Sequence, residues 1–229
     1  MRNTNCEMSK KITINENQFS DVILKEAMNG QFNKAAFDAM PSFVQKVKYC
    51  KTLFGEPIGN GSSRMVFQID DYRVFKLAKN PKGIAQNEQE LNILNDYYLD
   101  GLCIFPTVYK DSDTENYTYV ISDYVLPAKS SDFKRVLGLT FNQVALVIRT
   151  MDPYNRFEWA KDRKLLDYAY EKDEEFWGDV NDYIVGYDIP TGDLCSIRNW
   201  GFSPKYGGSM VLLDYGLNDD IYDKFYKRR

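Results

Sequence analysis

The chain has 229 residues, of which 44% are hydrophobic and 27% are charged, so it is long enough to bury a substantial core. A net charge of −4 gives no electrostatic reason to expect nucleic acid or an anionic membrane as a partner. The sequence contains no histidine, which excludes every mechanism that needs an imidazole, among them the Ser-His-Asp and Cys-His nucleophiles and histidine zinc sites.

Neither export nor membrane insertion is expected. The longest aliphatic stretch, residues 144–148, is far shorter than a membrane span, and residues 1–17 lack the apolar centre of a signal peptide. The four cysteines are each more than forty residues from the next, so neither a Cys-x-x-Cys metal site nor a disulfide framework is indicated. We therefore expect a cytoplasmic protein with reduced thiols.

The first part of the chain is expected to be helical. Apolar residues at helical spacing in residues 18–52 predict helices that are interrupted at Pro41. We assign residues 1–52 to an N-terminal helical extension. This extension could cap the lobe that follows it or dock on a protein partner.

The hydrophobic period changes from that of a helix to that of a strand after residue 52. Two β-rich runs joined by Asp70-Asp71 predict a hairpin, and a helix and a second β pair follow. Residues 53–125 are therefore expected to form a β-rich lobe. Its predicted elements are strands at 65–69 and 72–77, a helix at 84–98, and strands at 107–109 and 117–124.

The rest of the chain, residues 126–229, is expected to form a mainly helical lobe. The proline-containing segment 126–130 marks the boundary between the lobes. Interleaved acids and bases in the second long helical stretch are best explained as a solvated helix face. The predicted elements are helices at 140–151 and 157–187, a loop at 193–201, a strand at 210–214 and a terminal helix at 221–225.

The first candidate functional segment is the turn Ile58-Gly59-Asn60-Gly61, directly before the predicted hairpin. Because Gly59 and Gly61 have no Cβ, backbone N–H groups in this turn could approach phosphate oxygens. A turn with two glycines is more often only a turn. A strand rather than a helix follows, so the context is not that of a dinucleotide-binding fold.

The second candidate is Lys76, which lies inside an apolar strand on the same face as Val74. A buried ammonium group needs a carboxylate or a phosphate as its partner. Glu90 in the predicted helix could supply the carboxylate, and Glu88 is the alternative. For this pair alone, an exposed edge-strand lysine and a solvated glutamate remain the simpler explanation.

The third candidate is a set of oxygen ligands late in the chain, formed by Asp193, Asn199 and Asp214. Carboxylate and amide oxygens are the hard ligands that hold Mg²⁺ on a triphosphate, with phosphate and water completing the shell. Asp214 ends a predicted strand and begins Asp214-Tyr215-Gly216. Taken alone, that tripeptide fits an ordinary turn after a strand.

Considered together, these segments resemble in order and spacing the protein-kinase-like fold, which protein kinases share with aminoglycoside-phosphotransferase-like small-molecule kinases. The resemblance covers about residues 54–218. Residues 199–201 and 213–217 are also similar to small kinase-like proteins encoded by bacteriophages. The expected fold is therefore α+β and two-lobed, with a small antiparallel β lobe and a mainly helical lobe. The matching segments are the glycine turn with Val66, Val74-Phe75-Lys76, Glu90, the hinge-like residues 120–125, Asp193 with Asn199, and Asp214-Tyr215-Gly216.

The resemblance implies ATP and Mg²⁺ as cofactors and gives each matching residue a role. Gly59 and Gly61 would cover the phosphates, and Lys76, positioned by Glu90, would hold the α- and β-phosphates. The adenine would meet backbone groups of Asp123, Tyr124 and Val125 in a pocket lined by Ile58, Val66 and Val74. Asn199 and Asp214 would bind Mg²⁺, and Asp193 would accept the proton of the attacking hydroxyl.

The chain also departs from the kinase pattern. Arg64 stands at the third glycine position of the loop, and Thr191-Gly192 replaces the His-Arg pair before the catalytic aspartate. Cys195 stands where a lysine is usual. Asn199 lies six residues after Asp193 rather than five. These departures affect the predicted catalytic loop more than the predicted metal ligands.

Two functions from different classes remain open. The first is an ATP·Mg²⁺-binding kinase-like enzyme that transfers the terminal phosphate to a small molecule or to one specific protein. The second is a pseudokinase that serves as a protein-binding or regulatory module. A conventional Ser/Thr/Tyr protein kinase is not expected, because only thirteen residues follow Gly216. An unrelated α+β interaction domain is a third possibility, in which each match is coincidence.

Overall fold

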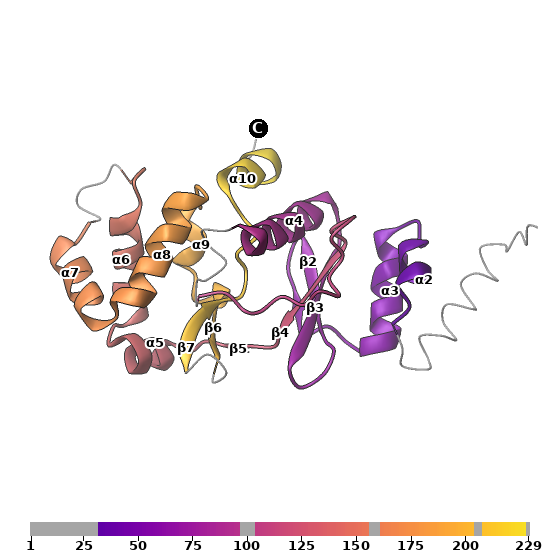
Figure 1. Cartoon of the computed structure of the whole chain (residues 1–229), viewed down its shortest axis with the longest axis horizontal. Coiled ribbons are helices and arrows are strands. Elements are labelled where there is room, and N and C mark those ends of the chain that lie inside the picture. Colours follow the sequence, from indigo (N-terminus) through magenta and orange to yellow (C-terminus); the bar gives the residue numbers. More distant parts are fainter. Residues whose placement is uncertain (1–31, 97–103, 156–160, 204–207, 228–229) are drawn as a thin grey trace, which may run out of the picture. The chain divides into compact units, whose positions relative to one another are not determined.

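The computed structural model describes residues 32–96, 104–155, 161–203 and 208–227 (Figure 1). It is an α+β structure in which helices accompany two antiparallel sheets. The chain divides into two compact units, Met1–Gly55 and Glu56–Arg229. The expectations for residues 1–31 lie outside the described residues.

The described part of the first unit consists of two helices, α2 (Lys34–Asp38) and α3 (Phe43–Phe54). Both begin at a polar cap, because the side chain of Asn33 accepts the N–H of Ala36 and the side chain of Ser42 accepts that of Gln45. The interruption predicted at Pro41 is confirmed. No helix in the described part of the chain is both long and apolar enough to cross a membrane.

The second unit begins with a four-stranded antiparallel sheet, sheet 1, in the order β1-β2-β3-β4. The predicted hairpin is confirmed as β2 and β3. The segment predicted as a strand at 107–109 makes only an isolated bridge, between Val108 and Ser122. Pro106 has no N–H for a longer ladder, and the chain turns where the N–H of Ser112 bonds the carbonyl of Tyr109. The strands are β1 (Gly59–Asn60), β2 (Arg64–Gln68), β3 (Arg73–Ala78) and β4 (Tyr119–Asp123).

Helix α4 (Pro81–Asn95) packs on β3 and β4 and begins earlier than predicted. The side chain of Asn80 accepts the N–H groups of Lys82 and Gly83, and Pro81 occupies the first turn, where its missing N–H costs nothing. The proline therefore ends the strand, as expected, and also starts the helix. Gly83 allows a close approach, since a Cβ there would collide with the carbonyl oxygen of Ser63.

A second antiparallel sheet has the order β5-β6-β7. It corrects the expectation that residues 126–130 form only a link, because Leu126 and Pro127 pair with Phe202 and Gly201. Gly201 makes this pairing possible, since a Cβ there would collide with Val125. Within the second unit, β6 and β7 lie between sheet 1 and the helices α5 to α8 (Figure 1). The strands are β5 (Leu126–Pro127), β6 (Trp200–Ser203) and β7 (Ser209–Leu212).

The helical part of the second unit packs around buried aromatic residues such as Phe133, Trp177 and Trp200. The predicted stretch 157–187 is two helices in its described part, because Asp173 ends one and caps the next by accepting the N–H of Phe176. The helices are α5 (Ser130–Leu137), α6 (Phe141–Met151), α7 (Arg163–Lys172), α8 (Glu174–Gly186), α9 (Thr191–Leu194) and α10 (Asp219–Phe225), with a 3₁₀ turn at Ile197–Asn199.

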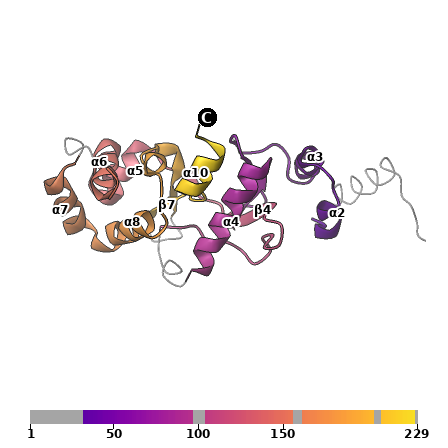
Figure 2. The same ribbon diagram turned by 90° about the horizontal axis from the view of Figure 1, so that it is seen from above.

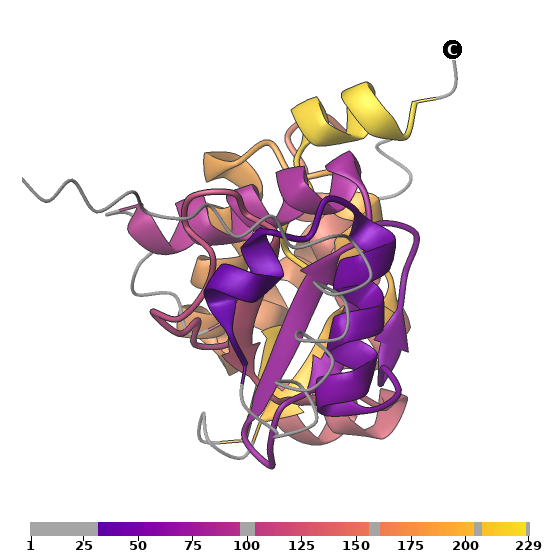
Figure 3. The ribbon, with the colours of Figure 1, turned by 90° about the vertical axis from the view of Figure 1, so that its right-hand side faces the viewer.

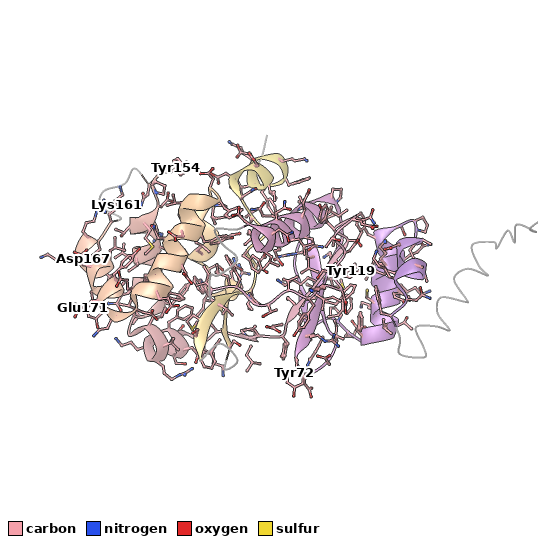
Figure 4. The ribbon with its side chains drawn as sticks, viewed as in Figure 1. Tyr72, Tyr119, Tyr154, Lys161, Asp167 and Glu171 are labelled. Atoms are coloured by element: carbon pink, nitrogen blue, oxygen red, sulfur yellow. The ribbon has the colours of Figure 1, made fainter. Side chains whose placement is uncertain are left out.

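Two further features of these helices bear on the predictions. The charged side chains of α7 are exposed, and Asp167 and Glu171 point outward in Figure 4, which confirms the solvated helix face. The segment 193–201, predicted as a loop, contains the end of α9, the 3₁₀ turn and the start of β6. Helix α10 lies beside α4, as Figures 2 and 3 both show.

Candidate functional site

One face of sheet 1 carries the candidate residues. The strand register sets Val66 opposite Lys76, and Lys76 opposite Val120. Since paired residues in an antiparallel sheet project to the same side and alternate along each strand, Arg64 and Ser122 share this face. The sheet therefore presents two cations and a hydroxyl group among apolar side chains.

Lys76 is buried, with 6% of its surface exposed, and it lies on a strand inside sheet 1, so the simpler explanation of an exposed edge-strand lysine is wrong. Its ammonium nitrogen lies 2.9 Å from Oε2 of Glu90 and donates to the carbonyl oxygen of Leu213 at 3.0 Å. Burial lowers the pKa of Lys76, although the charge of Glu90 partly offsets this effect. Glu88 is exposed, so Glu90 is the partner of the two glutamates that the sequence left open.

Arg64, which the sequence analysis noted only at the third glycine position of the loop, joins the same buried contacts. It begins β2, directly after the glycine turn, and 6% of its surface is exposed. Its Nη1 lies 2.6 Å from Oε1 of Glu90 and 3.4 Å from Oδ1 of Asn87, and its Nη2 donates to Asp214. Burial lowers the pKa of Arg64, but Glu90 and Asp214 outweigh it and hold the pKa above its ordinary value. The available signal was an arginine directly before an apolar strand, 24 residues from Glu88, the first acid of the helix that faces it.

These contacts make a balanced ion cluster of two cations, Arg64 and Lys76, and two carboxylates, Glu90 and Asp214. Glu90 is fully buried, and burial alone would raise its pKa. The two cations outweigh that effect and lower it. Asp214 is the open side of the cluster, because 43% of its side chain is exposed. A ligand would reach the cluster from the Asp214 side.

The backbone after Asp214 is held in place by two buried contacts. The hydroxyl of Tyr183 donates to the carbonyl oxygen of Tyr215 at 2.7 Å. A Cβ at Gly216 would collide with the backbone of Gln86 in α4, so only glycine fits there. Asp214-Tyr215-Gly216 is therefore tied both to α8 and to α4, and it is more than an ordinary turn after a strand.

The structure brings Asp193 and Asn199 to the same place. The side-chain amide of Asn199 donates to the backbone carbonyl oxygen of Asp193 at 3.0 Å. The backbone carbonyl oxygen of Asn199 in turn accepts the N–H of Leu213 at 2.8 Å. Burial, and secondly the charge of Asp214, raise the pKa of Asp193. Burial also raises the pKa of Tyr183, and the charges of Asp214, Glu90 and Asp193 raise it further.

The glycine turn is tied to the start of α4. The ammonium of Lys79 donates to the carbonyl oxygen of Gly61 at 2.6 Å and to Oδ1 of Asn60 at 2.7 Å. Neither Gly59 nor Gly61 has a positive φ, and a Cβ at either would make only ordinary or slightly close contacts. Neither backbone strain nor packing therefore requires these two glycines.

Two of the hinge-like residues make backbone hydrogen bonds within the protein. The backbone N–H of Asp123 donates to the carbonyl oxygen of Thr107 at 2.9 Å. The N–H of Tyr124 donates at 2.6 Å to the carbonyl oxygen of Tyr72, which lies at the tip of the β2–β3 hairpin (Figure 4). Beside them, the hydroxyl of Ser122 is fully buried and has no hydrogen-bond partner within the described ranges. A buried hydroxyl without a partner is costly, which makes Ser122 an unusual position on this face of the sheet.

The predicted base-pocket residues differ in exposure. Val74 is buried and Val66 is half-buried on the same face as Lys76, while Ile58 is exposed. Val125 is buried against Gly201. Val66 and Val74 are thus placed beside the ion cluster, and Ile58 is at the edge.

Both residues predicted to hold Mg²⁺ already make hydrogen bonds within the protein. The carboxylate of Asp214 accepts a hydrogen bond from the guanidinium of Arg64, and the side-chain NH₂ of Asn199 donates to the carbonyl oxygen of Asp193. No group of three or more His, Cys, Asp or Glu side chains that could hold a metal occurs among the residues that the structure describes.

Sequence comparisons do not add to this geometry. No protein-family model matches the chain, and no curated protein matches it in sequence.

Proposed function

We propose that this chain is a diverged kinase-like protein that binds ATP at the ion cluster and transfers its terminal phosphate to a small molecule or to one specific protein. The observation that carries the proposal is the buried Lys76–Glu90 pair, with Lys76 bonded also to Leu213 next to Asp214. The order of elements, a small antiparallel sheet with one helix followed by a mainly helical part, supports a two-lobed kinase-like fold.

The chemistry of the sheet face fits the parts of a nucleotide. Lys76 and Arg64 supply positive charge for phosphates. Val66 and Val74 offer apolar surface for a base, and the hydroxyl of Ser122 could bond its polar edge. Gly59 and Gly61, which strain and packing do not require, would let the turn approach the phosphates.

In the enzymatic form of the proposal, Asp193 is the proton acceptor. Its raised pKa makes it a stronger base than an exposed aspartate. The acceptor's hydroxyl oxygen would attack the terminal phosphorus while its proton passes to the carboxylate of Asp193. The bond from that phosphorus to the bridging oxygen breaks, and ADP leaves.

A pseudokinase is the second candidate, and one observation favours it. The guanidinium of Arg64 donates a hydrogen bond to the carboxylate of Asp214, which the kinase resemblance assigns to metal binding. In this case the chain would bind nucleotide without transferring phosphate and would act as a protein-binding or regulatory module, with the N-terminal helices as a candidate docking segment.

Isothermal titration with ATP tests nucleotide binding. We expect the wild type to bind ATP and Lys76→Ala to bind it at least tenfold more weakly, while Lys110→Ala, which removes an exposed lysine, keeps the wild-type affinity. Equal binding by the wild type and Lys76→Ala, or no binding by either, would overturn the proposal.

Turnover then separates the two candidates. ATP hydrolysis or transfer that is lost in Asp193→Asn, with ATP affinity unchanged, supports the enzyme. A wild type that binds ATP without any turnover supports the pseudokinase.

A further inference from the structure

We propose that Arg64 is the cation that this site uses in place of a divalent metal, so that ATP binds here without Mg²⁺. The inference rests on the proposed function, because it concerns the same nucleotide. It adds a role for a residue that no sequence match identified. It begins from one contact, in which a buried guanidinium donates to the carboxylate of Asp214.

The position of Arg64 is built into the fold. The residue follows the glycine turn, and the β2 register directs its side chain to the same face of sheet 1 as Lys76. There it contacts Glu90 and Asn87 on α4 and Asp214 after β7. Acceptors from two separate segments therefore fix the guanidinium, which is not the behaviour of a surface arginine that happens to lie nearby.

The charges of the site leave little attraction for a metal ion. A divalent cation on the Asp214 carboxylate would lie beside two buried positive charges, Arg64 and Lys76. Arg64 and Lys76 are almost out of contact with solvent, so water screens their repulsion of that ion mainly from the open side at Asp214. The two carboxylates of the cluster are already balanced by these two cations, so they leave no net negative charge to attract a metal ion.

Arginine is also suited to take over the metal's role toward phosphate. Its charge is permanent, and its planar group carries five N–H donors that match phosphate oxygens. Three hydrogen bonds to protein acceptors hold it next to Lys76, and the open side of the cluster is at Asp214. A triphosphate arriving from that side would meet both cations.

The test compares ATP affinity in Mg²⁺ and in EDTA by isothermal titration. We expect the affinity of the wild type for ATP in Mg²⁺ and its affinity in EDTA to agree within about threefold, because Arg64 rather than Mg²⁺ would meet the phosphates. We expect Arg64→Gln to lose at least tenfold in EDTA and to recover part of this loss in Mg²⁺. Arg73→Gln is the matched control, because Arg73 lies on the neighbouring strand and its ion pair is with Asp70, whose side chain is 37% exposed.

A second measurement uses metal alone. Electron paramagnetic resonance with Mn²⁺ and no nucleotide should detect no bound ion in the wild type and a bound ion in Arg64→Gln. If that variant does not fold, Arg64→Lys keeps the positive charge and should keep ATP binding in EDTA. Metal-dependent ATP binding by Arg64→Lys would count against the role of the charge.

The outcomes separate this inference from the proposed function. ATP binding by the wild type that disappears in EDTA, or Mn²⁺ binding by the wild type, would overturn the role of Arg64 and leave ATP binding standing. No ATP binding in either condition would overturn both.

Discussion

Arg64, Lys76 and Glu90 are three charged side chains that have lost almost all contact with solvent. Desolvating each charge is costly, and the cost is offset only while every partner is present. Glu90 is shared by both cations, one on each oxygen. It is therefore the residue on which the cluster depends most.

Replacement of Glu90 by glutamine should strongly destabilise the protein. The change leaves two buried cations with one half-exposed carboxylate, and breaking a buried pair costs about 3 to 5 kcal/mol. Glu88→Gln, two positions away and exposed, should change stability by less than about 0.5 kcal/mol. Urea unfolding of both variants measures this. Similar losses in the two would mean that the cluster contributes nothing specific.

The same residue predicts a dependence of stability on pH. The pKa of Glu90 is lowered in the folded state from its ordinary value of 4.5, so its contribution is complete above about pH 4.5 and is lost as the pH falls through the folded pKa. The free energy of unfolding should therefore decrease below this pH by up to about 1.4 kcal/mol per unit for this one proton. Between pH 5 and pH 3, the free energy of unfolding should depend less on pH in Glu90→Gln than in Glu88→Gln. The same pH dependence in both variants would contradict this prediction.

At the scale of elements, most boundaries follow from local chemistry. Asn80 caps α4, Thr140 caps α6 and Asp173 caps α8, each by accepting a backbone N–H of the first turn. The contacts between elements instead depend on where backbones meet closely. Gly216 against α4 is such a place, and so is Gly83 against the turn before β2.

Gly216→Ala should therefore destabilise the protein and displace Asp214, because the added methyl group collides with the backbone of Gln86. We expect a loss of about 1 to 3 kcal/mol, as for other overpacked sites. Gly178→Ala is the matched control, since the added Cβ in α8 meets nothing within 4 Å and alanine favours a helix by up to about 1 kcal/mol. Thermal unfolding should shift the two variants in opposite directions, and a shift in the same direction contradicts this account.

At the scale of the molecule, Glu56–Arg229 is one compact unit in which sheet 1 and the helical part share the ion cluster. Arg64 and Lys76 from the sheet bond Asp214 and Leu213, which follow β7. The hydroxyl of Tyr183 on α8 fixes the next residue, Tyr215. These buried contacts should make the sheet and the helices unfold together.

Native-state hydrogen exchange should detect this coupling. Slowly exchanging amides of β3 and of α8 should share one free energy of opening in the wild type, because neither element can separate without exposing buried charges. In Arg64→Gln the two values should diverge. Distinct free energies already in the wild type would mean that the two parts open independently.

The candidate site could be predicted in part. Alternation placed Lys76 on the same face as Val74, and the sequence left Glu88 and Glu90 open as its partner, which the structure shows to be Glu90. Asp193, Asn199 and Asp214 were grouped by order alone, and Asn199 is hydrogen-bonded both to Asp193 and to Leu213, the residue before Asp214. Arg64 was passed over, because its partners are Glu90 and a residue 150 positions away, which no local pattern indicates.

The amino-acid sequence determined the class of this chain by itself. Its hydrophobic periods specified an α+β chain, with the β2–β3 hairpin and the helices that follow, since period and caps are local properties. Tertiary structure alone decided which charges meet. Whether Arg64 faces Asp214 depends on how a sheet and a distant hairpin pack, and burial strengthens most the contact of Arg64 with Glu90, because water does not screen that pair.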